Sequence, residues 1–161
     1  MKKKKIWFST THITDDMKRF LVETLKREDY QIEYNELRRY TKKMHPWVIT
    51  KEMTRAQLSF QHKDNGPLYL LETGIKIAKE IQEGESNLIL ARTLYNNHKI
   101  FKFVLDCILS FGRETFTKRQ YYTRVKTRVP IMGYLYESNT SKYLNYVLGQ
   151  FMDLDIISVE K

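Results

Sequence analysis

Basic side chains fill the stretch FTKRQYYTRVKTRV, from Phe116 to Val129, which contains no acidic residue. On a helix, Tyr121, Tyr122 and Val125 share one arc, and basic and threonine side chains cover the remaining surface. Because like charges on one helix face repel each other, this face suits an anion that neutralises them. Arginine and lysine pair with phosphate, and threonine hydroxyls hydrogen-bond to it. The candidate phosphate-contacting residues are Lys118, Arg119, Thr123, Arg124, Lys126 and Arg128. The alternative is a basic face that is simply solvated.

A second polar face is expected on a helix from Ser141 to Met152. Its apolar residues gather on one arc, which leaves amide, ammonium and phenol groups on the opposite arc. In a winged-helix domain the third helix enters the major groove of DNA, where such groups read base edges. The candidate base-contacting residues are therefore Lys142, Asn145, Tyr146 and Gln150. The alternative is that these side chains only face water.

No catalytic residue is assigned, so enzyme activity of this stretch stays uncertain. A nuclease of the restriction type needs carboxylates for Mg²⁺ together with an acidic-x-Lys triplet, and only Asp16-Met17-Lys18 has that form. We interpret that triplet as part of a helix surface. The chain has no glycine-rich phosphate loop, and its histidines and Cys107 show no metal-ligand spacing. No cofactor and no metal ligand is therefore expected here, and Mg²⁺ would enter only with an attached nuclease domain.

The fold that positions these two helices is expected to be mainly α-helical with small β-hairpins, of the α+β class. We expect it to consist of tandem winged helix-turn-helix units. The turn signal Asn65-Gly66 predicts a β-hairpin, and Thr117 with Gln120 predicts a capping box. Thr14 is the expected cap of the first helix. The predicted helices are 14–27, 34–43, 50–58, one containing Ile75 to Ile81, 88–95, 100–111, 117–128 and 141–152, and the predicted strands are 58–62, 68–71 and 156–159. Gly112 should end the apolar helix 100–111. A polar link at 82–87 predicts two domains, 1–84 and 85–161.

The overall composition favours a polyanionic partner. The 161 residues carry a net charge of +9, and 42% of them are hydrophobic, which is enough for a core. A single cysteine suits a reducing compartment, so a cytoplasmic location is expected. No apolar run is long enough to span a membrane, and neither a membrane partner nor a small-molecule substrate is expected.

Three segments carry a resemblance to a known family: KKKKIWFSTT at the start, LYLLETGIKIAKEI from Leu68, and HKIFKFVLDCILSFGRETFTKRQYYTRVK from His98. Together they resemble the N-terminal recognition region of type IIS restriction endonucleases of the AlwI-like group, which includes nicking enzymes. More loosely, they resemble the tandem winged-helix recognition region of FokI-like enzymes. The resemblance implies a module that reads an asymmetric duplex-DNA site and is attached to, or associates with, a separate Mg²⁺-dependent nuclease half. Nothing in the chain matches that half.

Two other classes of function compete with specific duplex recognition. One is a winged-helix protein-interaction or assembly factor, such as a replication or phage accessory protein, with only non-specific affinity for DNA. The other is RNA binding through stacking on tyrosines. Most tyrosines fall on helix faces that we assign to packing, which disfavours RNA.

Overall fold

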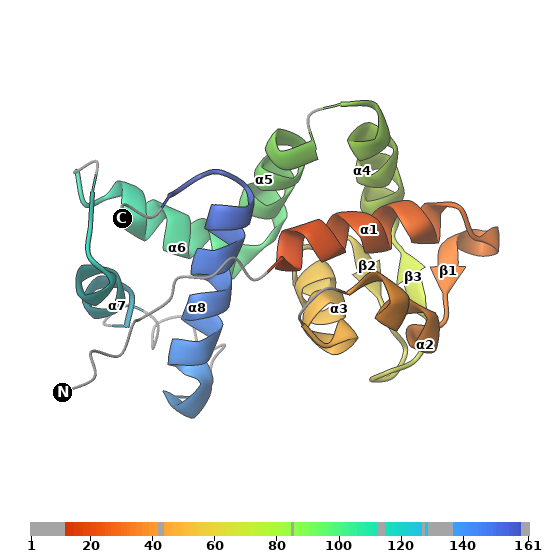
Figure 1. The fold of residues 1–161 in the computed structure, drawn as a ribbon, viewed down its shortest axis with the longest axis horizontal. Helices are drawn as coiled ribbons and strands as arrows, with labels where there is room; N and C mark the ends of the chain where they lie inside the picture. The colour runs from red at the N-terminus through yellow and green to blue at the C-terminus, as the bar shows by residue number, and fades with distance from the viewer. Residues whose placement is uncertain are drawn as a thin grey trace.

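The computed structural model of the chain describes residues 12–41, 44–84, 86–112, 115–126, 128 and 137–158; for 126 and 137–142 it defines the helical backbone alone. The expectation of a mainly helical α+β fold is confirmed, because the described residues form mostly helices and a small three-stranded antiparallel sheet. Figure 1 shows the sheet with α1 to α4 at one end of the molecule and α6 and α7 at the other, with α8 between them.

Helix α1 spans Ile13–Leu25 and packs through the predicted stripe, in which Met17, Phe20 and Leu21 are fully buried. The predicted cap at Thr14 is wrong. The residue that precedes the helix is His12, in a left-handed conformation with φ 58°, and Thr14 is already inside the first turn and buried. The backbone at His12 and Thr14 instead hydrogen-bonds to the carboxylate of Asp153, so a side chain that is distant in the sequence meets the first turn of α1.

The segment after α1 is more broken than the sequence suggests. A short 3₁₀ turn leads into strand β1 (Gln31–Ile32), which was not predicted, then α2 (Tyr34–Leu37) and a second 3₁₀ turn. The predicted helix 34–43 is therefore too long. Helix α3 spans Pro46–Arg55, so it starts earlier than the predicted 50–58. Proline explains this start, since its fixed φ and missing N–H suit the first position of a helix.

The predicted hairpin is confirmed. Strand β2 is Ser59–Phe60 and β3 is Leu68–Leu70, shorter than predicted but in the expected places. Strand β3 lies in the centre of the sheet, between β1 and β2. Asn65 takes the left-handed conformation at the turn with φ 61°, and the N–H of Gly66 donates to the carbonyl of Lys63 at 3.1 Å.

Helix α4 (Glu72–Glu83) follows β3 directly and buries Ile77, Ala78 and Ile81 as predicted. Gly74 lets this helix pass close to the start of the hairpin. A Cβ added at Gly74 would lie 2.0 Å from the carbonyl oxygen of Leu58, which itself accepts the N–H of Leu71 at 2.9 Å. Only glycine allows this approach between helix and chain.

The second half contains α5 (Ser86–Asn97), α6 (Lys99–Leu109), α7 (Lys118–Lys126) and α8 (Glu137–Asp153). All four were predicted, with α5 and α8 too short, α7 too long and α6 shifted. Helix α6 ends at Leu109 with Ser110 as its C-cap, so it stops before the predicted end at Gly112, which takes a φ of 61° beyond the helix. Helix α6 is not buried all round, because Leu109 is 68% exposed. The predicted strand 156–159 is wrong for 156–158, which form no strand, and residue 159 lies outside the described part.

Buried side chains from both halves belong to one hydrophobic cluster. Helix α8 contacts both α1 and α7, and its residues Leu144, Val147 and Phe151 are almost completely buried. Residues on either side of the expected boundary at 84/85 therefore share a core, and the division into 1–84 and 85–161 stays a prediction.

Candidate nucleic-acid interface

The start of α7 is built by the predicted capping box. The Thr117 hydroxyl accepts the backbone N–H of Gln120 at 3.1 Å, and the Gln120 side-chain oxygen accepts the backbone N–H of Thr117 at 2.8 Å. Two donors that a helix start leaves without an intrahelical acceptor are satisfied in this way. The first turn of the basic helix is therefore defined by its own sequence.

Tyrosines attach α7 to α8, on the arc that the sequence predicts. Tyr121 is fully buried and its hydroxyl donates to the carbonyl of Leu144 at 2.9 Å, while the hydroxyl of Tyr122 donates to the side chain of Asn145. Burial raises the pKa of both tyrosines, so both hydroxyls stay protonated donors. Val125 is also fully buried. These contacts turn the opposite face of α7 outward.

Three of the six candidate phosphate contacts are exposed, two of them on α7 and the third, Arg128, just beyond its end. Arg119, Thr123 and Arg128 are exposed, and neither arginine has a carboxylate partner among the residues that the structure describes. Arg128 reaches the sulfur of Cys107 with an N–S distance of 3.9 Å. The side chain of Lys126 lies outside the described residues.

The other two cations of α7 are held against aromatic rings. The Lys118 ammonium lies 5.6 Å from the ring centre of Tyr122, and partial burial lowers the pKa of Lys118. The Arg124 guanidinium lies 4.9 Å from the ring centre of Phe111 and donates to Ser110 Oγ at 3.3 Å. Contacts with a ring restrict a cation without neutralising it. Lys118 and Arg124 therefore remain charged and are partly ordered.

Helix α8 presents only part of the polar face that the sequence predicts, because one of its four candidate residues is buried. Gln150 is fully buried, and its amide nitrogen donates to Glu52 Oε2 at 2.9 Å. The expectation that Gln150 reaches a base edge is wrong for this fold, because Gln150 satisfies a carboxylate inside the protein. Asn145 is exposed but accepts from Tyr122, and Tyr146 is half-buried. The side chain of Lys142 lies outside the described residues.

The carboxylate that Gln150 contacts is the centre of a buried polar cluster. Glu52 of α3 is 1% exposed and accepts four hydrogen bonds, two on each oxygen. At Oε2 the donors are Gln150 and His98 Nε2, the latter at 2.8 Å. At Oε1 they are the hydroxyl of Tyr143 and the guanidinium of Arg55, each at 2.7 Å. The cluster joins α3 to the start of α6 and to α8.

His98 contributes to this cluster through both ring nitrogens. Its Nδ1 accepts the backbone N–H of Phe101 at 3.1 Å and so caps helix α6. A nitrogen that accepts carries no proton, so the ring proton sits on Nε2 and points to Glu52. Burial alone would raise the pKa of Glu52, but the hydrogen bond and electrostatic attraction of His98, the charge of Arg55 and the hydrogen bond from Gln150 outweigh burial and lower this pKa to about 2. Glu52 is therefore ionised at neutral pH.

The sequence analysis missed the exposed side of α3, which lies opposite its buried residues. Trp47, Lys51, Thr54 and Arg55 are exposed there at helical spacing. Together with the turn between β2 and β3, the start of α3 borders an open groove of about 310 Å³. Pro46 was the signal that could have placed this helix, because proline is common at the first helical position.

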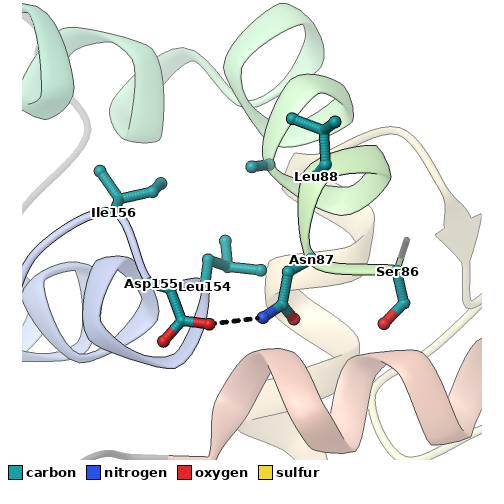
Figure 2. A pocket seen from close by; sticks show the side chains of 7 residues that line it. Ser86, Asn87, Leu88, Leu154, Asp155 and Ile156 are labelled. Carbon is teal, nitrogen blue, oxygen red and sulfur yellow. Dashed lines mark hydrogen bonds between the residues drawn. The ribbon is translucent and has the colours of Figure 1, made fainter.

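A second hollow lies where α5 meets the end of α8. Figure 2 shows Asn87 pointing toward Asp155, and its amide nitrogen donates to Asp155 Oδ2 at 3.0 Å. Lys18 of α1 donates to the same asparagine side chain. Leu88, Ala91, Leu154 and Ile156 supply the apolar part of this wall. Polar contacts among Lys18, Asn87 and Asp155 therefore link the two halves of the chain here, and apolar side chains line the rest of the hollow.

Comparison with protein-family models, with curated proteins and with solved structures found no match to this chain. The resemblance to endonuclease recognition regions therefore stays an expectation. In the described ranges, no group of three or more His, Cys, Asp and Glu side chains is arranged to hold a metal ion. Within the same ranges, no helix combines the length and the apolarity needed to cross a bilayer.

Proposed function

We propose that this chain is a duplex-DNA-binding module that grips backbone phosphate with exposed cations on α7 and just after its end. The observation that carries the proposal is the pair Arg119 and Arg128, two exposed cations without a carboxylate partner in the described part of the chain. A helix without acids of its own leaves that charge for an anion. The net charge of +9 supports the same class of partner.

The order of elements in the first half supports a finer proposal, a winged helix. The order α1, β1, α2, α3, β2, β3, with β3 between β1 and β2, is the arrangement of a helical domain with a hairpin wing. In such a domain the third helix faces the groove, and here that helix is α3. Its exposed residues Lys51 and Thr54 then face DNA, whereas α8 packs against α1 and α7.

We further propose that recognition is sequence-specific and that the module works with a nuclease domain or subunit, as the sequence resemblance implies. Mg²⁺ would belong to that nuclease part. The testable core of this proposal is a preference for one short asymmetric site at physiological ionic strength. A selection from a random duplex library should enrich such a site, and a pool that stays random would overturn specificity.

Phosphate binding by α7 is tested by the double variant Arg119→Ala/Arg128→Ala. Affinity for a labelled duplex should fall, and the slope of log affinity against log salt should become shallower by about two, roughly one for each phosphate contact. The matched control is Lys76→Ala/Lys79→Ala, which removes the same charge from exposed positions on α4. If both double variants change the slope equally, the binding is only diffuse attraction to a basic protein.

A second candidate function, a protein-interaction factor with weak DNA affinity, is favoured by one observation. Leu109, at the end of α6, is 68% exposed beside the half-buried Phe111. A large apolar side chain in that position suits a protein contact. If Arg119→Ala/Arg128→Ala leaves the salt slope unchanged, the surface around Leu109 becomes the candidate site for a protein partner.

A further inference from the structure

We propose that the groove between α3 and the β2–β3 turn holds an unpaired nucleobase stacked on Trp47. This inference rests on the proposed function, because the base would belong to a DNA strand gripped elsewhere on the protein. The groove has a volume of about 310 Å³ and is lined by Trp47, Thr50, Lys51, Gln61, Asp64 and Asn65. That volume is near the lower end for small-ligand sites, which start at about 300 Å³.

Trp47 is the aromatic side chain of this groove, and its ring is partly exposed. Trp47 is 42% exposed, and among the described residues its ring contacts no other aromatic ring. The nearby aromatic side chains of the hairpin pair with each other instead, since Phe60 stacks on Tyr69 at 5.1 Å between ring centres. The exposed part of the Trp47 indole is therefore available as a stacking platform for a base, since every base has a π-face.

The polar groups around Trp47 suit a base with its phosphate better than a phosphate alone. The Lys51 ammonium lies 5.2 Å from the Trp47 ring centre and is in position to pair with an anion. Asp64 at the turn would repel a bare phosphate placed in the groove, whereas its carboxylate can accept from amino or imino groups on a base edge. The groove is thus close to neutral and has groups that match a base edge.

The hairpin side of the groove is held in place before any ligand arrives. The side-chain nitrogen of Gln61 donates to the carbonyl of Gly66 at 2.9 Å, which leaves the Gln61 oxygen as an acceptor. The turn is closed by the bond from Gly66 to Lys63 and by the left-handed conformation of Asn65. A rigid site loses little conformational entropy when it binds, which favours base recognition here.

Trp47 fluorescence tests the proposal directly. The chain has two tryptophans, so Trp7→Phe leaves Trp47 as the only one. This protein is titrated with three short DNAs of one sequence: a paired duplex, the same duplex with a single-base bulge, and a single strand. The bulged duplex and the single strand should quench Trp47, and the bulged duplex should bind about tenfold more tightly than the paired one, the range expected for one stacked base. Anisotropy of a labelled strand measures binding independently of quenching.

Variants separate stacking from general binding. In the protein with both tryptophans, Trp47→Ala should lose the preference for the bulge and keep the affinity for the paired duplex. Tyr30→Ala, which removes another exposed aromatic ring, should keep both. Thermal unfolding of each variant checks that the fold survives.

Each remaining outcome has one meaning. If every DNA binds by anisotropy but none quenches Trp47, base stacking is overturned and the proposed DNA binding stands. If no DNA binds, both proposals fail. Quenching by free dAMP without a response to any oligonucleotide would overturn the strand-borne base and assign the groove to a free nucleotide.

Discussion

Glu52 and Gln150 lie 98 positions apart in the sequence and are joined by a hydrogen bond of 2.9 Å in the interior. This contact connects the helix beside the hairpin, α3, to the helix that supports the basic face, α8. Because α8 also contacts α7, the Glu52 cluster fixes how the two proposed DNA-facing surfaces are placed. The cluster is thus a structural centre, and its stability can be measured without a ligand.

Removing the charge of Glu52 should destabilise the whole chain. In Glu52→Gln an amide NH₂ replaces one carboxylate oxygen. The two donors that bonded to this oxygen then face another donor and have no acceptor. We expect the free energy of unfolding to fall by about 3 kcal/mol, the scale for breaking a buried charged network. Urea unfolding measures this change. The control Glu83→Gln, at an exposed position of α4, should change it by less than about 0.5 kcal/mol.

The same carboxylate predicts a dependence of stability on pH. The pKa of Glu52 is lowered from 4.5 to about 2 in the folded chain, so its stabilisation is complete above pH 4.5 and is lost as the pH falls toward 2. Between pH 6 and pH 3 the wild-type chain should lose about 2 kcal/mol more than Glu52→Gln. Asp153 acts in the opposite direction, because burial and Asp15 raise its pKa. The comparison with Glu52→Gln isolates the Glu52 contribution, and equal losses in both proteins would contradict it.

The close approach between Gly74 and Leu58 predicts that an alanine at position 74 will destabilise the fold, although the residues next to Gly74 in the sequence do not suggest it. Gly74→Ala would place a methyl group 2.0 Å from the carbonyl oxygen of Leu58, so the backbone must move. We expect a loss of about 3 kcal/mol in unfolding free energy. Gly112→Ala meets nothing within 4 Å but keeps a φ of 61°, so it should cost only about 1 kcal/mol. A reversed order of the two variants would contradict this account of the packing.

The capping box of α7 predicts a smaller, local effect. Thr117→Ala removes the hydroxyl that accepts the N–H of Gln120 and should lower stability by about 1 kcal/mol. Thr123→Ala, in the exposed middle of the same helix, should be neutral or slightly stabilising, since alanine has the higher helix propensity. Thermal unfolding followed by circular dichroism compares the two. Equal destabilisation by both variants would mean that the box does not hold the helix start.

Local chemistry made part of the fold predictable from the sequence. The spacing of apolar residues predicted α1, α4 and α6, the Asn65-Gly66 turn predicted the hairpin, and Thr117 with Gln120 predicted the start of α7. Each of these features depends on residues a few positions apart, whose interactions a sequence pattern contains. The inward direction of Tyr121 and Val125 followed from the same helical period.

Only the tertiary structure decided which polar residues are buried. Helical period assigned Gln150 to the solvent, but a polar side chain can be buried wherever a partner satisfies it, and its partner Glu52 is far away in the sequence. For the same reason the sequence did not show that Gln150 of α8 is buried or that α3 has an exposed side. Strand β1 was also missed, because two residues have no period and pair only once β3 is in place. The sequence by itself thus determined the local elements and the basic face of α7, and long-range packing decided which faces remain available for a partner.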